Sequence, residues 1–147
     1  MTDSPGKFLY FDIETHSADE IWDMAPDDFF RLGQYAWDDG PVVLTGSRTE
    51  LIEQIEKAPY IVGHNIFGFD LTALYGKDSM RPLEVAQQRR VVDTIVLAHL
   101  LTPAPYSYTN RQGHTFYDAS KPESAMRYYG LDNLCSQFGL EGKLGNL

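Results

Sequence analysis

Two acidic residues end one of the most apolar runs of the chain. The stretch YFDIET, residues 10–15, follows Phe8 and Leu9 and places Asp12 and Glu14 two positions apart. Residues two apart in a β-strand project from the same face, about 6–7 Å from each other. Two carboxylates placed in this way repel, and one takes up a proton unless a cation keeps both ionised. Hard oxygen ligands favour Mg²⁺ or Mn²⁺ over Zn²⁺. An isolated D-x-E is more often a strand end beside a solvated turn, so the pair alone does not decide.

A further aspartate lies in a more detailed setting. Residues 63–74, GHNIFGFDLTAL, have the pattern of a strand end, then polar His64 and Asn65, then an aromatic residue before Asp70 at a helix start. An aspartate at that position makes a good N-cap without any chemical role. The combination of residues is more specific than a cap requires, which favours a functional site.

These residues need a scaffold of strands and helices. Apolar runs, turn residues and helix caps predict the elements, and strands mixed with helices indicate an α/β protein with a mixed sheet. Periodicity does not decide whether residues 91–101 form a helix or a buried strand that leads into one. The predicted elements are strands at 7–11 and 60–63, a hairpin of 29–37 and 42–44, helices at 50–58, 71–75 and 131–138, and an irregular segment at 102–121.

Length and composition fit a globular protein with a substantial core. A chain of 147 residues suits one domain. The net charge of −9 argues against a general basic surface for nucleic acid, although bound metal can supply positive charge at a local site. A single cysteine, Cys135, allows no internal disulfide and fits a reducing compartment. No apolar run is long enough to span a bilayer and the N-terminus does not resemble a signal peptide, so a cytoplasmic protein with no membrane partner is expected.

Three stretches in this order resemble the 3′–5′ exonucleases of the DEDD superfamily, above all the proofreading domain of phage A-family DNA polymerases. They are D-I-E-T at 12–15, N-x-x-x-F-D at 65–70 and D-T-x-x-L-A-x-L-L at 93–101. The stretch LDNLCSQFGLEGKL resembles the helix that precedes the last motif of those domains. The resemblance covers residues 7–143, with 29–58 and 102–130 matching poorly. It implies an α/β ribonuclease H-like fold, a mixed sheet flanked by helices, in a single exonuclease-like domain over residues 1–147.

The resemblance also implies a two-metal phosphodiesterase that removes nucleotides from a single-stranded DNA 3′ end in replication. Two Mg²⁺ or Mn²⁺ ions about 4 Å apart would hold the scissile phosphate, one activating water and the other stabilising the leaving 3′ oxygen. Phe69 either packs against the terminal nucleotide or fills the core, and the core is favoured. The implied roles are catalysis and metal binding for Asp12, Glu14 and Asp70, contact with the terminal nucleotide for Thr15 (backbone), Asn65 and Phe69, and a supporting position for His64 and Asp93.

The fourth acid of the family is not found at a matching position. The family places an Asp on a late helix, preceded by Tyr four residues earlier or His five residues earlier. Tyr128 and Asp132 have the first spacing, but Gly130 lies between them and an i, i+4 pair needs a continuous helix; His114 and Asp118 have the wrong spacing. We therefore expect the domain to be incomplete at its C-terminus, without its last helix, and weakly active or inactive by itself.

Three functions remain open at this point. The first is the proofreading-type exonuclease, alone or joined to a polymerase domain or subunit. The second is a stand-alone exonuclease that acts on RNA, which the motifs do not separate from DNA. The third is a catalytically silent module with the exonuclease fold that binds nucleic acid or a polymerase.

Overall fold

The computed structural model describes residues 4–101, 107–109, 115–118 and 128–141. Its contacts divide the chain into two compact units, Met1–Thr94 and Ile95–Leu147. The single domain over residues 1–147 stays a prediction.

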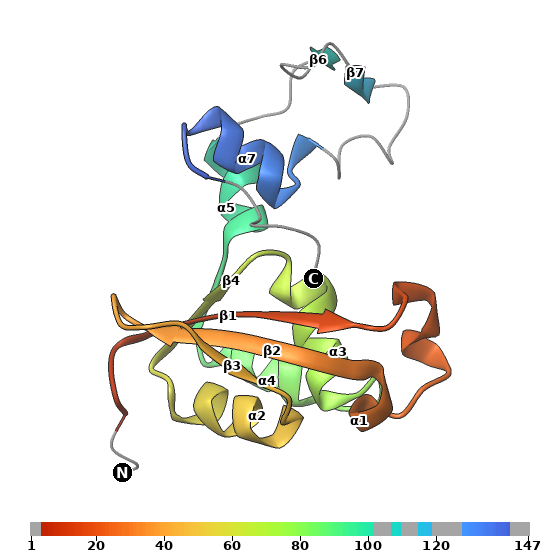
Figure 1. Ribbon diagram of the computed structural model, residues 1–147, viewed down its shortest axis with the longest axis vertical. Coiled ribbons are helices and arrows are strands. Elements are labelled where there is room, and N and C mark those ends of the chain that lie inside the picture. The colour runs from red at the N-terminus through yellow and green to blue at the C-terminus, as the bar shows by residue number, and fades with distance from the viewer. Residues whose placement is uncertain (1–3, 102–106, 110–114, 119–127, 142–147) are drawn as a thin grey trace. The chain divides into compact units, whose positions relative to one another are not determined.

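The first unit contains a five-stranded mixed sheet (Figure 1). The strand order is β3-β2-β1-β4-β5. The strand β2 runs antiparallel to its neighbours β1 and β3, whereas β4 runs parallel to its neighbours β1 and β5. This mixed sheet with its helices confirms the predicted α/β, ribonuclease H-like fold class. The strands are β1 Phe8–Thr15, β2 Phe30–Trp37, β3 Val43–Thr45, β4 Tyr60–Gly63 and β5 Val91–Asp93.

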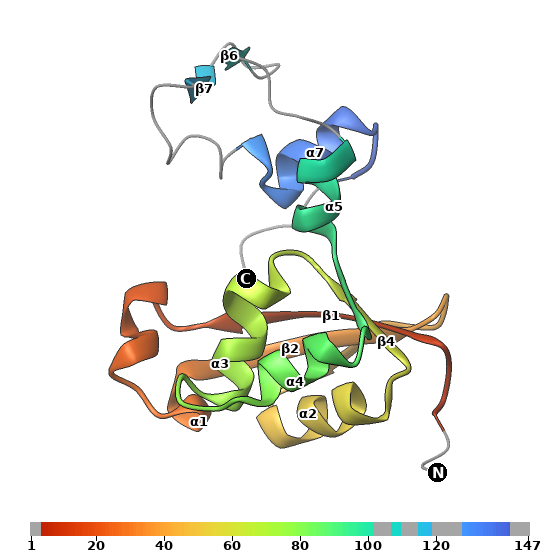
Figure 2. The same cartoon turned by 180° about the vertical axis from the view of Figure 1, so that it is seen from behind.

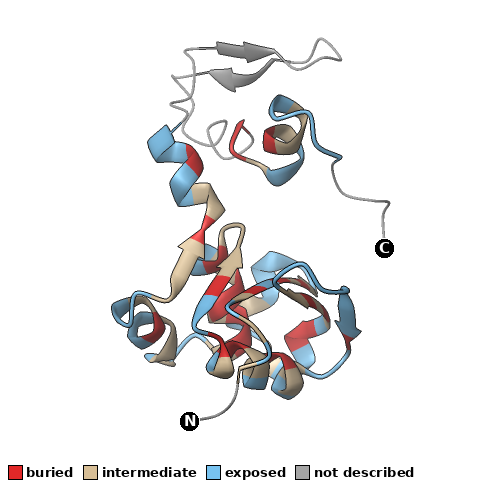
Figure 3. Cartoon of the chain, turned by 90° about the vertical axis from the view of Figure 1, so that its left-hand side faces the viewer, coloured by how far each residue is buried: buried red, intermediate tan, exposed pale blue. Residues whose placement is uncertain are grey.

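Helices of this unit pack against alternate positions of the central strand β1 (Figure 2). Leu9, Phe11 and Ile13 are buried, whereas the residues between them are half-buried or exposed. Leu51 and Ile55 on one face of α2 join the same core. In Figure 3 the buried residues of the chain are coloured red. The helices are η1 Ala18–Trp22, α1 Pro26–Phe29, α2 Arg48–Lys57, η2 Ile66–Asp70, α3 Leu71–Tyr75 and α4 Arg81–Gln87.

Several elements begin and end where local chemistry predicts. Ser47 caps α2, because its side chain accepts a hydrogen bond from the Glu50 amide. The helix α3 covers the predicted residues 71–75 and stops at Gly76, whose φ of 92° suits glycine. The second alternative for residues 91–101 is the observed one, since β5 leads directly into helix α5.

Some elements differ from the sequence-based prediction; for example, α2 begins at Arg48, two residues before the predicted start. We expected the first strand to end at residue 11, where the apolar run ends, but β1 continues to Thr15 because its backbone still pairs with β2. Asp12 and Glu14 therefore lie inside the strand. The helix α4 was not expected, although Pro82 and Glu84 in its first turn are residues typical of a helix start.

The described residues of the second unit include two helices and a pair of short antiparallel strands. A small cluster joins Ala98 of α5 to Tyr128, Tyr129 and Leu134. The segment 102–121, expected to be irregular, contains two short antiparallel strands, and its other residues lie outside the described part of the chain. The final helix ends as predicted, with Gly139 at a φ of 70°. The elements are α5 Thr94–Leu101, β6 Ser107–Thr109, β7 Thr115–Asp118 and α7 Leu131–Gln137.

Among the residues that the structure describes, no helix combines the length and apolar character needed to cross a bilayer.

Candidate active site

Asp12 and Glu14 lie on the same face of β1, as the strand period requires. Both are half-buried, and buried Ile13 between them faces the core. Gln34 lies opposite Asp12 on β2, and its Nε2 donates a hydrogen bond to Asp12 Oδ2 at 3.0 Å. Gln34 was not singled out from the sequence, because β1 and β2 are joined by residues 16–29 and no short turn sets their register.

The pairing of β1 with β2 becomes irregular just beyond these acids. The register shifts between Glu14 and Thr15, and such bulges occur next to active sites because they redirect the chain. The Thr15 hydroxyl donates to the His16 carbonyl at 2.7 Å, and the His16 amide donates to the Phe29 carbonyl at 3.0 Å. The backbone of Thr15 is thus held at the same end of β1 as the two carboxylates.

Asp70 ends the single π-type turn η2 and lies almost fully inside the protein, with 5% of its surface exposed. Its side chain makes no capping hydrogen bond to α3, so the simple N-cap explanation is wrong. Burial raises the pKa of Asp70 from 3.8 to about 7, and the charge of Asp12 acts in the same direction. The backbone N–H groups of Asp70 and Ile13 act in the opposite direction by favouring the ionised form. The hydrogen bond from the Ile13 amide places the Asp70 carboxyl beside β1, close enough to Asp12 for the charge of that residue to act on it.

This carboxylate pair suits a hard divalent cation. Two acids in a partly dry setting resist ionising together, and a bound cation would relieve that cost for both. In the described residues, Arg48 forms an ion pair with Asp27, and Arg81 forms ion pairs with Glu56 and Glu84. None of these ion pairs includes Asp12 or Asp70. Within the same residues, no three His, Cys, Asp or Glu side chains are close enough to form a complete metal-binding group. The structure thus brings Asp12 and Asp70 together and places Glu14 on the same face of the strand.

Asn65 is held in an unusual conformation between β4 and Asp70. Its φ of 58° lies in the left-handed region, which asparagine tolerates better than most residues. The Asn65 amide donates to Asp93 Oδ1 at 2.8 Å, and the Phe67 amide donates to Asp93 Oδ2 at 3.0 Å. Asp93 therefore ties its segment to a neighbouring backbone, as we expected.

The other two residues near this turn have mainly structural contacts. His64 Nδ1 lies 2.9 Å from Thr94 Oγ1, and the same hydroxyl donates to the Gly63 carbonyl at 3.1 Å. Phe69 packs edge-on against Phe29, with ring centroids 6.1 Å apart, and contacts the main core. This packing matches the core interpretation that we favoured; contact between Phe69 and a substrate stays a prediction.

The residues that imitate the third motif do not share a helix. The helix α7 begins at Leu131 with Gly130 as its N-cap, so Tyr128 precedes it and Asp132 lies in its first turn. The sequence-based rejection of this pair is confirmed. His114 of the other imitation lies outside the described residues.

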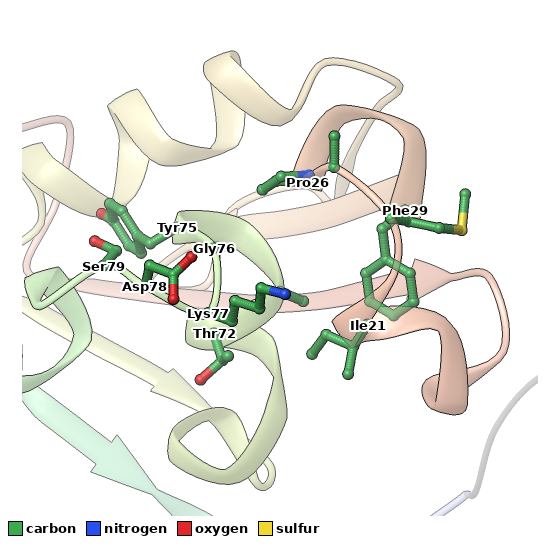
Figure 4. A pocket seen from close by; sticks show the side chains of 12 residues that line it. Ile21, Pro26, Phe29, Thr72, Tyr75, Gly76, Lys77, Asp78 and Ser79 are labelled. Carbon is green, nitrogen blue, oxygen red and sulfur yellow. The ribbon is translucent and has the colours of Figure 1, made fainter.

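A pocket of about 340 Å³ lies elsewhere in the first unit (Figure 4). It is formed by η1, α1 and the end of α3, and none of the acids discussed above lines it. Lys77, which lies at this pocket, donates to the Trp22 carbonyl at 2.8 Å. Its lining residues are Ile21, Met24, Ala25, Pro26, Phe29, Thr72, Ala73, Tyr75, Gly76, Lys77, Asp78 and Ser79.

Comparisons with known proteins give little further information. No protein-family model matches the chain, and no curated protein matches it. Among solved structures, the chain is similar to the family B DNA polymerase from the hyperthermophilic archaeon Pyrobaculum calidifontis, at 17% identity and a TM-score of 0.45. The match covers 92% of this chain, which spans 18% of the length of that polymerase chain. Because so distant a likeness carries no weight, the description of the fold rests on the sheet topology, and any function is a proposal.

Proposed function

We propose that this chain is a metal-dependent 3′–5′ exonuclease module of the proofreading type. The observation that supports it is the placement of Asp70, a buried carboxyl with a raised pKa next to Asp12 at the end of the central strand. A buried acid beside another acid is costly for the fold. Such a cost is characteristic of functional sites, where the arrangement serves chemistry rather than stability.

Each acid has a distinct position in the proposed site. Asp12, Glu14 and Asp70 would hold Mg²⁺ or Mn²⁺, which when bound supply charge stabilisation for a phosphodiester and a more acidic water. Gln34 orients the Asp12 carboxylate through its hydrogen bond. Because the pKa of Asp70 is about 7, that group must lose a proton to bind a cation below neutral pH.

The products define the direction of cleavage. Water would attack the phosphorus of the last phosphodiester, the bond to the 3′ oxygen of the preceding nucleotide would break, and a 5′-mononucleotide would leave. The backbone of Thr15 and the side chain of Asn65 are the groups that we expect to contact the terminal nucleotide. A single-stranded DNA 3′ end is the proposed substrate.

The test uses the purified 147-residue chain and a single-stranded DNA oligonucleotide labelled at its 5′ end. We expect slow, Mn²⁺- or Mg²⁺-dependent shortening from the 3′ end, seen as a ladder of labelled products. Asp12→Ala and Asp70→Ala should abolish it, whereas Asp78→Ala, which removes an exposed acid, should not. A phosphorothioate in the last linkage should slow the reaction, and one in the first linkage should not.

Two results would overturn the exonuclease proposal. One is the absence of both nucleotide release and Mn²⁺ binding by calorimetry at pH 8. The other is cleavage that persists in Asp12→Ala and Asp70→Ala, because the activity would then come from another site or a contaminant. An RNA oligonucleotide of the same sequence, assayed beside the DNA, decides between the two polymer classes.

A catalytically silent module is the second candidate, and one observation favours it. Tyr128 and Asp132, the described residues with the spacing of a third motif, are separated by the start of α7 at Gly130. A silent module would bind single-stranded nucleic acid or a polymerase without cleaving it. Fluorescence anisotropy with a labelled oligonucleotide in Mg²⁺ separates the two candidates, since binding without shortening would indicate the silent module.

A further inference from the structure

Asp93 lies at the last position of β5, where its carboxylate is nearly inaccessible. Only 4% of the residue is exposed, and it pairs with Gly63 in the parallel ladder between β4 and β5. Each carboxylate oxygen accepts one backbone hydrogen bond, from the amides of Asn65 and Phe67. Hydrogen bonds from backbone N–H groups to a carboxylate are stronger than those to neutral acceptors. The residue therefore restrains two of the first positions of the turn that leads to Asp70.

The restrained residues are connected to Asp70 by continuous backbone hydrogen bonds. The Asn65 carbonyl accepts from the Phe69 amide at 3.1 Å, and the Ile66 carbonyl accepts from the Leu71 amide. Single π-type turns of this kind occur often at functional sites. Because Asp70 lies inside this hydrogen-bonded segment, a shift at Asn65 would move Asp70 as well.

The turn also has little room to adjust. A Cβ atom on Gly68 would lie 2.3 Å from Asn65 Oδ1, and one on Gly63 would lie 2.3 Å from Ile66 Cγ2 and 3.0 Å from the Phe11 carbonyl. Thr94, the residue after Asp93, holds the Gly63 carbonyl through its hydroxyl. Asp93 at the end of β5 and Thr94 at the start of α5 therefore hold the first part of the connection that follows β4, from Gly63 to Phe67.

We propose that Asp93 is a positioning residue, which sets the place of Asp70 by holding the Asn65–Phe67 backbone. This inference rests on the proposed exonuclease function. The expected consequence is specific: loss of the Asp93 carboxylate should weaken metal binding and the rate of cleavage, although Asp93 itself touches neither metal nor substrate. Residues that support metal ligands in this way change affinity or activity by about 10–100-fold when mutated.

The main test compares Asp93→Asn with Asp38→Asn in the full chain. The Asp93→Asn side chain would keep the shape of the aspartate but place an NH₂ group where one backbone amide needs an acceptor. Asp38 is a matched control, since its carboxylate also accepts backbone hydrogen bonds, from the amides of Lys7 and Phe8, at the opposite end of β1. For Asp93→Asn we expect faster amide hydrogen exchange at Asn65 and Phe67, and losses of about 10–100-fold in Mn²⁺ affinity and kcat. The control should keep wild-type values once the folded fraction is accounted for.

The outcomes separate this inference from the proposed function. Active wild-type protein with unchanged kcat and Mn²⁺ affinity in Asp93→Asn overturns the positioning role alone, as does a loss equal to that of Asp38→Asn. Wild-type protein that neither binds Mn²⁺ nor cleaves overturns the function, and faster exchange at Asn65 would then leave Asp93 with a purely structural role. If Asp93→Asn does not fold, amide hydrogen exchange in the wild-type protein provides the test. Mg²⁺ should slow exchange at the amides of Asn65 and Phe67, because coupling between the metal site and this backbone acts in both directions. Unchanged exchange rates would refute the inference.

Discussion

Replacing Asp70 by asparagine should raise the unfolding free energy of the metal-free protein relative to wild type, and this gain should grow as the pH rises above 3.8. The pKa of Asp70 rises from 3.8 to about 7 on folding, chiefly because of burial. A raised pKa means that the folded state holds its proton more tightly than the unfolded state does. The contribution of Asp70 to stability is therefore intact below pH 3.8 and is lost progressively as the pH rises towards 7.

The size of the effect follows from the two pKa values. A difference of about three units corresponds to about 4 kcal/mol of unfolding free energy, at about 1.36 kcal/mol per unit. Only 5% of Asp70 is exposed, so solvent screening reduces this figure little. The amide side chain of the Asp70→Asn variant would not titrate. The gain in unfolding free energy of Asp70→Asn over wild type should therefore grow by about 4 kcal/mol between pH 4 and pH 8, and any pH-independent cost of the amide cancels in this difference.

Urea unfolding in EDTA, followed by the fluorescence of Trp22 and Trp37, measures this quantity at each pH. Ile13→Val is a suitable control, because it removes one buried methyl group next to the same carboxyl at a cost of about 1 kcal/mol that should not vary with pH. Addition of Mg²⁺ at pH 8 should stabilise wild type and leave Asp70→Asn unchanged. If the wild-type and Asp70→Asn curves run parallel from pH 4 to pH 8, the argument from the buried carboxyl is refuted.

Three further predictions follow from the same structure. Gln34→Leu should lower Mn²⁺ affinity by about 10–100-fold in calorimetry, because Asp12 loses the donor that orients its carboxylate. The control Gln54→Leu, on the neighbouring helix α2, should keep the wild-type affinity. Equal affinities in the two variants would contradict this role of Gln34. Mg²⁺ should raise the melting temperature more at pH 8 than at pH 5.5, because a proton on Asp70 competes with the ion. Equal increases in melting temperature at both pH values would argue against Asp70 as a ligand. Ser47→Ala should lower the unfolding free energy by about 1 kcal/mol in urea titrations, since α2 loses its N-cap; no change would show that water replaces the cap.

The sequence predicted the parts of the fold that local chemistry determines. The end of α3 follows from its glycine stop and the hairpin from the turn at residues 38–41, whereas α2 begins two residues before its predicted start at residue 50. The full length of β1 was missed, because polar Asp12 and Glu14 hide a strand that backbone pairing continues. In general, an apolar pattern reports which residues are buried and not how far a ladder extends.

The sequence singled out the candidate acids and the supporting residue Asp93, but not every contact that holds them. Asp12, Glu14 and Asp70 were found because their spacing resembles a family, and the structure places Asp12 and Asp70 together. Gln34 was missed, because its contact depends on the register between β1 and β2, which a long connection separates in the sequence. The left-handed turn at Asn65 was missed as well, since the hydrogen bonds that hold it come from β5, far away in the sequence.

The central place of β1 has a consequence for how the protein folds. On one side β1 pairs with β2, its neighbour in sequence, and on the other with β4, which comes much later. Local pairings form faster than distant ones, because closing a long loop costs more entropy. We therefore expect β1, β2 and β3 to form an early meander, with β4, β5 and Asp70 docking afterwards. A chain stalled halfway would carry Asp12 and Glu14 without Asp70, and so could not form the metal site that we propose. Stopped-flow mixing with Mg²⁺ would contradict this order if the ion accelerated the earliest folding phase.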